Sequence, residues 1–596
     1  MIQTIQQQLT QHIKEAVKTL FGGDLPDSQL ALQETRKEFE GQLTAVVFPI
    51  TRFSRKSPEA TGEAIGQYLM ARMPEIVAFN TIKGFLNISL SDTYWTTFFT
   101  THIESEGFGR FPSNGRKLLV EYSSPNTNKP LHLGHIRNNL LGYAVAEILK
   151  AYGYEVIKAN LVNDRGIHIC KSMLAWQRWG NGETPESSGL KGDHLVGKYY
   201  VLFDQAYKKE IDALKEQGQS EAEAKKNAPL IQQAQQLLQR WETGDDEVIA
   251  LWKMMNGWVY CGFEETYGRL GVDFDKYYYE SDTYLLGKDL INEGLEKGVF
   301  FRKPDQSVWI DLTADGLDEK LVLRGDGTSV YITQDLGTAA LKYEDFVADE
   351  SIYVVGNEQD YHFKVLFLIL QKLGKTWANG LFHLSYGMVD LPSGKMKSRE
   401  GTVVDADDLM DEMEETARQR TEVLGKTAEL ADEDKQHLYR MIGMGALKYF
   451  LLKVEPKKRL LFDPNESIDF QGHTGPFIQY THARIRSVLA KANEVKPGVV
   501  RRGVPSVLAS SERDLIQLLG NYPDVIASSA REFSPAQLAN YMYEVAKQYN
   551  KFYHEESILK ADDPIIRQFR VDLSAATARI IADGMRLIGI EVPERM

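Results

Sequence analysis

The chain has 596 residues, which at about 150 residues per domain predicts three or four domains. It carries 69 Lys and Arg against 83 Asp and Glu, a net charge of −14. This acidic total argues against a protein that binds nucleic acid over its whole surface, but it permits a local basic groove. Its two cysteines, Cys170 and Cys261, have no CxxC spacing. They exclude a disulfide framework and a cysteine-based zinc module, and they fit a reducing compartment.

The N-terminal segment is polar and lacks the apolar core of a signal peptide. No run in the sequence reaches the roughly 18–20 apolar residues of a membrane span, so we expect a soluble, cytoplasmic protein with no membrane partner. Residues 1–112 are predicted to form a small α/β module. Its expected elements are helices over 2–21 and 57–73, a strand over 43–53, and strand residues around Gly84 over 76–91. A Gly, Pro, Asn and Ser cluster near residue 112 marks its end.

A strand–loop–helix–strand order begins the next segment, 113–404. A short apolar strand over 118–124 is followed by a breaker and by an amphipathic helix over 133–153, and the next strand covers 154–164. This is a βαβ unit, so we predict a doubly wound, parallel, Rossmann-like sheet. A polar helical stretch over about 205–245 indicates a surface insertion within about 180–280, and its mixed charge argues against a nucleic-acid contact there.

Strand signals return after the insertion, which indicates that the sheet resumes; they cover 307–312, 329–335, 351–359 and 381–391. From 405 onward the pattern is almost entirely helical. We divide it into a helical junction over 405–455 and an all-α bundle over 456–596. The predicted fold class is therefore α/β with a C-terminal helical domain.

Two motifs carry chemistry. His132-Leu133-Gly134-His135 opens the helix after the first strand, where unpaired N–H groups and the helix dipole attract anions and Gly134 lets a nucleotide approach the backbone. A capped helix with two incidental histidines is the alternative. The basic loop over 393–402, Gly-flanked, suits closure over a triphosphate. Taken alone, a basic loop of this kind is more often a solvated turn.

Together, HLGH and KMKS in this order on a doubly wound sheet resemble the HIGH and KMSKS signatures of class I aminoacyl-tRNA synthetases. Further segments resemble the arginyl-tRNA synthetases, from about Lys83 to Met596: VEYSSPNTNKPLHLGHIRNN, DGTSVYITQDLGTAALKYE, HLSYGMV, NESIDFQGHTGPFIQYTHARIRSV and the terminal GIEVPERM. The chain departs from the family pattern in two places. Ser398 stands where a second lysine is usual, and Arg165 stands where the family commonly has a tryptophan.

The resemblance implies ATP-dependent activation of L-arginine and its transfer to the 3′-terminal adenosine of tRNA(Arg). ATP would bring Mg²⁺ with it, and no metal site on the protein is expected. Because phosphoryl-centred displacement relies on positioning and on charge stabilisation, no enzyme nucleophile is required. The nucleotide and its phosphates would be contacted by His132, Gly134, His135, Asn128 and Lys129, and the developing charge would be stabilised by Lys395, Lys397 and Arg399.

A guanidinium needs carboxylates, because it stays charged and offers a planar fork of donors. Asp335 is the leading candidate, Tyr331 lies four residues before it, and Glu121 at the end of the first strand is the second acid. By resemblance, the rest of the arginine molecule would be bound by Ser124, Asn126, His132 and Gln359. A helix N-cap is the alternative role for Asp335.

Aromatic and basic residues in the helical block suit unstacked bases of an RNA loop. By resemblance this block is an anticodon-binding domain, and the N-terminal module contacts the tRNA elbow. The candidates are Tyr480, Arg484, Lys547 and Tyr549 in the block, and Phe85 and Asn87 in the module. Aromatic residues at helical spacing more often belong to a core, and an apolar strand with one Asn explains the module residues equally well.

Three other hypotheses stay open. A small-molecule nucleotidyltransferase also uses HxGH, but it has no need of so long a helical block. A non-catalytic RNA-binding paralogue conflicts with the intact HLGH and the acidic residues. A class I synthetase for another amino acid is the nearest alternative, and the Asp335 and Glu121 pair favours a cationic substrate. By resemblance we expect a monomer.

Overall fold

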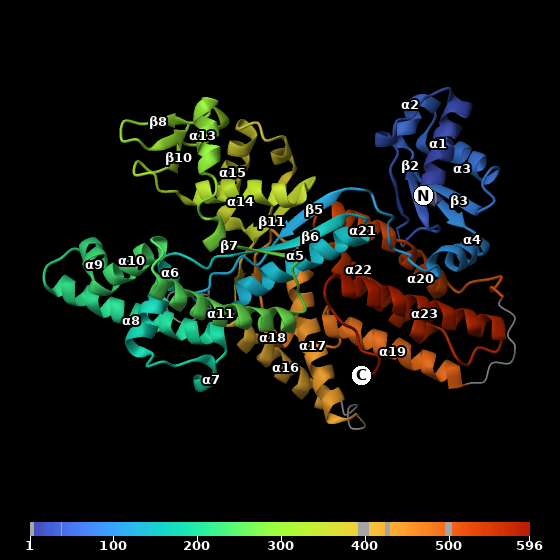
Figure 1. Ribbon diagram of the computed structural model, residues 1–596. Helices are drawn as coiled ribbons and strands as arrows, with labels where there is room; N and C mark the ends of the chain where they lie inside the picture. The colour runs from blue at the N-terminus through green and yellow to red at the C-terminus, as the bar shows by residue number, and fades with distance from the viewer. Residues whose placement is uncertain (1–4, 37, 391–403, 424–429, 495–502) are drawn as a thin grey trace. The chain divides into compact units, whose positions relative to one another are not determined.

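The computed structural model describes residues 5–36, 38–390, 404–423, 430–494 and 503–596 (Figure 1). The chain divides into two compact units. The first comprises residues 1–108, 488–521 and 548–577, and the second comprises 109–487, 522–547 and 578–596.

The first unit contains a four-stranded antiparallel sheet in the order β1-β2-β4-β3, with α1 and α3 packed together beside it. The hairpin between β3 and β4 turns at Lys83 and Gly84, which both have positive φ, as a tight two-residue turn between right-twisted strands requires. The strand predicted over 43–53 ends early, because Phe48–Ile50 form a 3₁₀ turn that leads into α2. The elements are α1 (Ile5–Phe21), β1 (Leu32–Glu34), β2 (Leu43–Val46), α2 (Thr51–Ser54), α3 (Pro58–Met70), β3 (Ile76–Ile82), β4 (Phe85–Leu90) and α4 (Asp92–Phe98).

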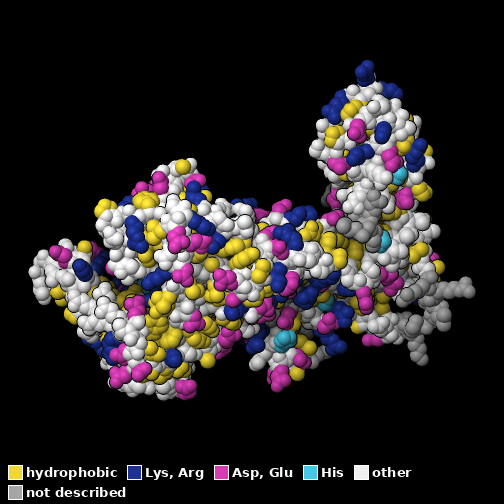
Figure 2. Space-filling view, turned by 45° about the horizontal axis from the view of Figure 1, so that its top comes forward, with side chains coloured by type: hydrophobic (Ala, Val, Ile, Leu, Met, Phe, Trp, Pro, Cys, Tyr) yellow, Lys and Arg dark blue, Asp and Glu magenta, His cyan; other side chains and the backbone are white. Residues whose placement is uncertain are grey.

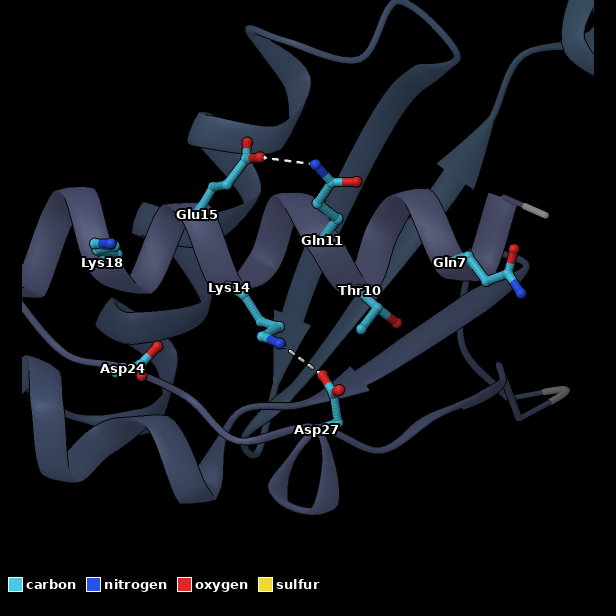
Figure 3. Close-up of a pocket in the computed structure, with 8 residues that line it drawn as sticks. All are labelled: Gln7, Thr10, Gln11, Lys14, Glu15, Lys18, Asp24 and Asp27. Carbon is cyan, nitrogen blue, oxygen red and sulfur yellow. Dashed lines mark hydrogen bonds and ion pairs between the residues drawn. The ribbon is translucent and has the colours of Figure 1, made fainter. Parts of the chain in front are cut away.

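Helix α1 has one apolar and one polar face, which explains its position. Leu9, Ile13, Ala16 and Val17 are buried against the module. The opposite face borders an open hollow of about 450 Å³ (Figure 3). Across this hollow Lys14 pairs with Asp27 at 2.8 Å. The hollow is thus a solvated surface with mutually paired charges.

Parts of the C-terminal helices belong to this same unit: α20 (Ser510–Gly520), the end of α22 (Pro535–Glu555) and the beginning of α23 (Pro564–Leu587). Asp92, the first residue of α4, accepts hydrogen bonds from Arg513 Nη2 at 2.7 Å and from the Leu508 amide at 3.1 Å. The N-terminal module and these helices therefore form one structural unit, although more than 400 residues separate them in sequence.

The second unit is built on a five-stranded sheet in the order β12-β11-β5-β6-β7, with every pair parallel. The predicted doubly wound Rossmann-like fold is confirmed. Strand β5 is fully buried because Leu118, Leu119 and Val120 are covered on both faces. Helix α5 packs on β5, β6 and β11. The elements are β5 (Lys117–Glu121), α5 (Leu133–Ala151), β6 (Glu155–Val162), β7 (Lys276–Tyr279), β11 (Glu350–Gly356), α15 (Asp360–Lys372) and β12 (Leu381–Tyr386).

A helical segment connects β6 to β7. Its long helix α8 packs along α6 and α11, and α10 packs on α6 (Figure 1). The helices are α6 (Ile167–Trp179), α7 (Pro185–Ser188), α8 (Gly192–Glu216), α9 (Glu221–Asn227), α10 (Pro229–Glu242) and α11 (Asp246–Leu270), and α12 (Glu280–Thr283) follows β7.

Two of the predicted strand segments do not join the parallel sheet. Residues 307–312 contribute β9 to a small antiparallel sheet in the order β10-β9-β8. Residues 331–335 begin helix α14, because Ile332, Leu336 and Ala339 recur at helical spacing and bury their side chains in one core with α13 and α15. The elements are α13 (Lys288–Glu296), β8 (Phe301–Arg302), β9 (Val308–Ile310), β10 (Lys320–Leu323) and α14 (Tyr331–Phe346).

Among the described residues after Asp405, the regular elements are helices, as predicted, apart from β14, which pairs with β13. The final residues run along α19, where Gln479 Nε2 donates to the Glu591 carbonyl at 2.8 Å. Within the described ranges, no helix is long and apolar enough to cross a membrane. The elements are β13 (Val389–Asp390), α16 (Ala406–Val423), α17 (Asp432–Leu452), β14 (Leu460–Leu461), α18 (Pro464–Ser467), α19 (Gly475–Glu494) and α21 (Tyr522–Arg531), followed by α22 and α23.

Candidate active site

The crevice between β5 and β11 lies where the strand order reverses. From β5 the chain proceeds to β6 and β7 on one side, and it later returns to β11 and β12 on the other. In open parallel sheets, ligands bind at such a switch point, outside the carboxyl ends of the strands. Most of the predicted catalytic and arginine-binding residues follow β5 or β11 directly, in the segments 121–135 and 357–359.

Two consecutive serines after β5 adopt the left-handed conformation, with φ of 76° at Ser123 and 46° at Ser124. Side chains from neighbouring elements hold them there: Asn138 Oδ1 accepts from the Ser123 amide at 2.5 Å, and Asn160 Oδ1 accepts from the Ser124 amide at 3.2 Å. Such backbone persists only where the surroundings determine it, and it concentrates at functional sites. The turn sets the direction of the loop that leads to His132.

His132 is the N-cap of α5, and the Nδ1 atoms of both histidines accept hydrogen bonds from backbone amides of this turn. The His132 amide donates to Nδ1 of His135 at 3.1 Å, and the Gly134 amide donates to Nδ1 of His132 at 3.1 Å. The ring centroids lie 3.9 Å apart. Because each Nδ1 accepts, the proton of each neutral ring is on Nε2, where it can be donated to a ligand.

Both imidazoles stay neutral at physiological pH. Burial and the nearby Lys129 charge lower the pKa of His132 to about 4, and burial together with His132 and Lys129 lowers the pKa of His135 well below its usual value. The pair therefore presents two N–H donors, rather than two cations, at a helix N-terminus. This arrangement suits phosphate oxygens.

Lys129 supplies the positive charge of this region. Burial lowers its pKa, and among the residues that the structure describes it has no carboxylate partner within ion-pair distance. A half-buried cation without a counter-charge favours binding of an anion. Asn128, its neighbour, is buried. The structure thus brings together the described nucleotide candidates: Asn128, Lys129, His132, Gly134 and His135.

The predicted guanidinium-binding residues of α14 occupy its first two turns. Tyr331 begins the helix and is 80% exposed. Asp335 is about one-third exposed, and its Oδ2 lies 2.6 Å from Nε2 of His362 on α15. The N-cap of α14 is Val330, so the alternative role of Asp335 as a helix cap is wrong.

Glu121 already has a partner. Its carboxylate forms an ion pair with Lys342 of α14, and both side chains are buried. The Lys342 ammonium also lies 4.8 Å from the centre of the Tyr353 ring. The charge of Lys342 therefore largely offsets that of Glu121, and the ion pair ties β5 to α14, the helix that carries Asp335.

Sequence reasoning missed a further acid, Glu280, which directly follows β7. Burial, reinforced by the charges of Asp164 and Asp335 and opposed by that of Arg165, raises the pKa of Glu280 to about 7. The carboxylates of Glu280 and Asp335 thus influence one another. The sequence signal that could have identified Glu280 was its position, since an acid at the carboxyl end of a parallel strand faces the ligand crevice.

The candidates for the amino-acid backbone lie on both sides of the crevice. Ser124 is half-buried beside Asn160 of β6. Asn126 is exposed and forms a parallel bridge with Asn163. Gln359 is exposed and is the N-cap of α15, three residues before His362.

The unusual Arg165 is accommodated by an aromatic pocket. Its guanidinium carbon lies 3.9 Å from the ring centre of Tyr284 and 5.5 Å from that of Trp241, and it pairs with Glu242 at 2.5 Å. The close approach of the guanidinium to the faces of aromatic rings explains how an arginine is held where the family commonly has tryptophan. Next to it, buried Asp164 accepts from Ser281 and Tyr260 and so joins β6 to α11 and α12.

The basic loop residues Lys395, Lys397 and Arg399 lie outside the described residues. The segment after the loop pairs with the HLGH segment: the Leu133 amide donates to the Val404 carbonyl at 3.2 Å, and the Ala406 amide donates to the Leu131 carbonyl at 3.0 Å. The backbone that follows the basic loop is thus fixed directly to the start of α5.

Asp407, next to Ala406, stabilises this attachment through ion pairs with Lys191 and Arg269. It accepts from Lys191 Nζ at 2.6 Å, Arg269 Nη1 at 3.2 Å and His194 Nε2 at 3.1 Å, and this network lowers its pKa. Although Asp193, His194 and Asp407 are close enough together to hold a metal ion, Lys191 and Arg269 already neutralise them. The cluster is therefore an ion-pair anchor between α8, α11 and α16.

We expect Asp407→Asn to lower kcat for adenylate formation about tenfold while leaving the KM for arginine unchanged. The substitution leaves Lys191 and Arg269 without their shared counter-charge and loosens the segment next to His132. ATP–pyrophosphate exchange measures both constants. Asp411→Asn is the matched control, because Asp411 also pairs with Arg269 but is exposed. Equal effects of the two variants, or a change confined to KM, would contradict the role.

The RNA-contact candidates differ in exposure. Lys547 is exposed, and the Arg484 guanidinium lies 5.0 Å from the ring centre of Tyr480. Phe85 packs edge-on against Phe48, whereas Asn87 is buried between Thr44 and Asn80 within the sheet. Tyr549 is completely buried, with its hydroxyl 3.2 Å from Ser574 Oγ, so its ring lies in the core.

Comparison with known proteins places this site in context. Residues 104–463 match the model of the class I (R) tRNA synthetase catalytic domain, and residues 478–596 match the DALR anticodon binding domain. An arginine–tRNA ligase of Parabacteroides distasonis is 55% identical over 99% of this chain and 100% of its own. That of Flavobacterium psychrophilum is 56% identical over 100% of both.

Solved structures agree. The Thermus thermophilus arginyl-tRNA synthetase matches with a TM-score of 0.79 and 25% identity over 100% of both chains, and the Plasmodium falciparum enzyme has the same fold, with a TM-score of 0.73, 18% identity and 99% coverage of both. The parallel sheet, the HLGH crevice and the matched catalytic domain define a class I aminoacyl-tRNA synthetase fold. Within that class, the chain belongs to the arginyl-tRNA synthetase family.

Proposed function

We propose that the chain is an arginine–tRNA ligase, which consumes ATP to activate L-arginine and transfers it to the 3′-terminal adenosine of tRNA(Arg). The observation that carries the proposal is that two neutral N–H donors and a half-buried lysine follow β5, while the acids Asp335 on α14 and Glu280 directly after β7 act on one another through their charges. One group of residues suits phosphates, and the other suits a guanidinium.

In the first step, the arginine carboxylate attacks the α-phosphorus of ATP, and pyrophosphate leaves. ATP carries Mg²⁺ as part of the substrate. The Nε2–H groups of His132 and His135 donate to the phosphates, Lys129 offsets their charge, and Asn128 and Gly134 border the nucleotide. Lys395, Lys397 and Arg399 complete the charge stabilisation of the transition state, in which most of the catalysis lies.

The arginine side chain is held by charge. Asp335 and Glu280 face the guanidinium, Tyr331 covers it, and Glu121 contributes from its ion pair with Lys342. Ser124, Asn126, His132 and Gln359 orient the α-amino and carboxylate groups. In the second step, a ribose hydroxyl of the terminal adenosine attacks the activated carbonyl, and AMP leaves.

We assign residues 1–112 to tRNA contact, 113–404 to catalysis, 405–455 to a junction and 456–596 to anticodon binding. RNA contacts are proposed for Phe85, Tyr480, Arg484 and Lys547, whereas the buried side chains of Asn87 and Tyr549 support these surfaces from within. The protein is proposed to act as a cytoplasmic monomer.

Aminoacylation of total tRNA, tested against each amino acid in turn, examines the function directly. Arginine alone should be charged in an ATP-dependent manner. Charging of a different amino acid, or ATP–pyrophosphate exchange that never yields aminoacyl-tRNA, would contradict the assignment.

Arginine binding should strengthen as pH rises through about 7, because Glu280 loses its proton near this pH and the resulting carboxylate attracts the guanidinium. Below pH 7, binding should take place with release of protons. Calorimetric titration in two buffers of different ionisation enthalpy measures the release. In Glu280→Gln the pH dependence should vanish; an unchanged profile in that variant would assign it to another group.

A further inference from the structure

Asp335, the leading candidate for binding the guanidinium, is held by a contact from the neighbouring helix. Its Oδ2 lies 2.6 Å from Nε2 of His362, the third residue of α15. Because a carboxylate only accepts hydrogen bonds, the hydrogen of this bond lies on Nε2 of the imidazole. Helix α15 follows β11 after a single 3₁₀ turn, so the bond lies near the carboxyl end of that strand, where ligands bind in such sheets.

The charge of Asp335 is not offset by a lysine or an arginine. Figure 2 shows Asp and Glu interspersed with Lys and Arg over the visible face, and Glu121 pairs with Lys342 in the interior. Within the part of the chain that the structure describes, no Lys or Arg comes within ion-pair distance of Asp335. An imidazole can donate a hydrogen bond while neutral, whereas a lysine or an arginine would bring a positive charge. His362 can therefore hold this carboxylate and leave it the charge that attracts a guanidinium.

The first turn of α15 is itself fixed to the sheet, which makes the imidazole a firm support. Phe363, next to His362, stacks on the ring of His383 from β12, with the ring centres 4.4 Å apart. His383 Nε2 donates to the Val355 carbonyl of β11 at 3.0 Å, and its Nδ1 lies 3.4 Å from Oδ1 of Asp360, the first residue of α15. Residues of two strands thus set the position of His362.

The bond to His362 leaves one oxygen of Asp335 available. Among the described residues, Oδ1 has no hydrogen-bond partner, whereas Oδ2 accepts from His362. Without the imidazole, a side chain that is about one-third exposed would rotate about its torsions, and ordering it around a ligand would cost conformational entropy. A group that folding has already ordered binds its ligand more tightly, because this cost does not arise at the binding step.

We infer that His362 is a positioning residue for arginine: its Nε2–H fixes the Asp335 carboxylate in the orientation that accepts the guanidinium. His362 acts through Asp335, so it determines how strongly arginine binds and takes no part in the chemical step. This inference rests on the proposed function, because it takes arginine as the substrate.

The test compares two uncharged amides that differ by one methylene group. In His362→Gln the amide reaches about as far as Nε2 of the imidazole and can still donate to Asp335. In His362→Asn the amide ends near the position of Nδ1 and falls short of the carboxylate. His362→Gln is therefore the matched control. Steady-state charging at saturating ATP and tRNA, with arginine varied, gives KM and kcat, and thermal unfolding reports on the fold.

His362→Asn should raise the KM for arginine about tenfold, the usual effect of losing one hydrogen bond to a charged group. The kcat, the KM for ATP and the unfolding temperature should stay unchanged, and His362→Gln should restore most of the arginine affinity. An unchanged arginine KM in His362→Asn, or equal effects of the two amides, would overturn the inference. A lowered KM would also overturn it, because the imidazole would then compete with the guanidinium.

A double-mutant cycle determines whether the effect passes through Asp335. Asp335→Asn alone should raise the arginine KM about 100-fold, and adding His362→Asn should raise it little further, because no charge is left to orient. Independent effects would instead multiply to about 1000-fold, and that result would contradict a role through Asp335.

Failure of the inference and failure of the proposed function give different results. If the unaltered enzyme charges arginine and His362→Asn keeps its arginine KM, only the positioning role falls. If the unaltered enzyme does not charge arginine, the function itself is wrong, and the inference falls with it.

Discussion

Replacing Asp335 with Asn should raise the KM for arginine about 100-fold and change the KM for ATP little. The substitution keeps the shape of the side chain but removes the charge facing the guanidinium, and losing one partner of a hydrogen-bonded charge pair costs about 2–5 kcal/mol. Since 1.4 kcal/mol corresponds to a factor of ten, two orders of magnitude lie within this range. Steady-state charging at saturating ATP and tRNA, with arginine varied, measures the effect.

The structure identifies control variants for the Asp335→Asn experiment. Asp335 is not the cap of α14, so the variant should fold normally. Glu344→Gln on the same helix also removes one negative charge, but at an exposed position, and should leave the arginine KM unchanged. Because Lys342 offsets Glu121, we expect Glu280 to retain the residual binding, and Asp335→Asn with Glu280→Gln should be worse than either change alone. An unaltered arginine KM in Asp335→Asn would move the pocket elsewhere.

His135→Ala should lower kcat for adenylate formation by about 10²–10³, the usual loss for one preorganised donor in a transition state. Two effects combine: the Nε2–H donor disappears, and the His132 amide loses its acceptor, which loosens the orientation of the first imidazole. Arginine binding should barely change. Single-turnover formation of the adenylate measures the step.

Thermal unfolding of His135→Ala separates chemistry from folding, because a stable variant with a slow chemical step supports the assignment. Since the pKa of His132 is about 4 and that of His135 is also depressed, neither ring should produce a rate change between pH 6 and 8. A near-normal rate of adenylate formation in the variant would remove the phosphate-binding role from HLGH.

The ion-pair anchor formed by Asp407 ties the helical insertion to the segment beside His132. Lys191, the N-cap of α8, and His194, in its first turn, both pair with Asp407. The helical insertion therefore helps to fix the backbone beside His132.

Local sequence patterns were sufficient to predict a helix or strand where a single periodicity holds along the whole segment. The apolar run of β5, the cap at His132 and the amphipathic helices after Asp405 all follow from neighbouring residues. The order of HLGH and the basic loop on such a sheet indicated the class of protein, because the switch point places the residues that follow β5 at the ligand crevice.

Tertiary packing decided the rest. Residues 331–335 were predicted to form the end of a strand, yet they begin α14 because Ile332 and Leu336 fill a core shared with α13 and α15. The pairing of Glu121 with Lys342, of Asp407 with Lys191, and of Arg165 with an aromatic pocket joins residues 76 to 221 positions apart, for which no local pattern exists. The sequence by itself determined which chemical groups the protein carries. The tertiary structure decided which of these groups keep an uncompensated charge and can therefore bind a ligand. The reason is that their ion-pair partners lie far away in the sequence, and only folding brings them close.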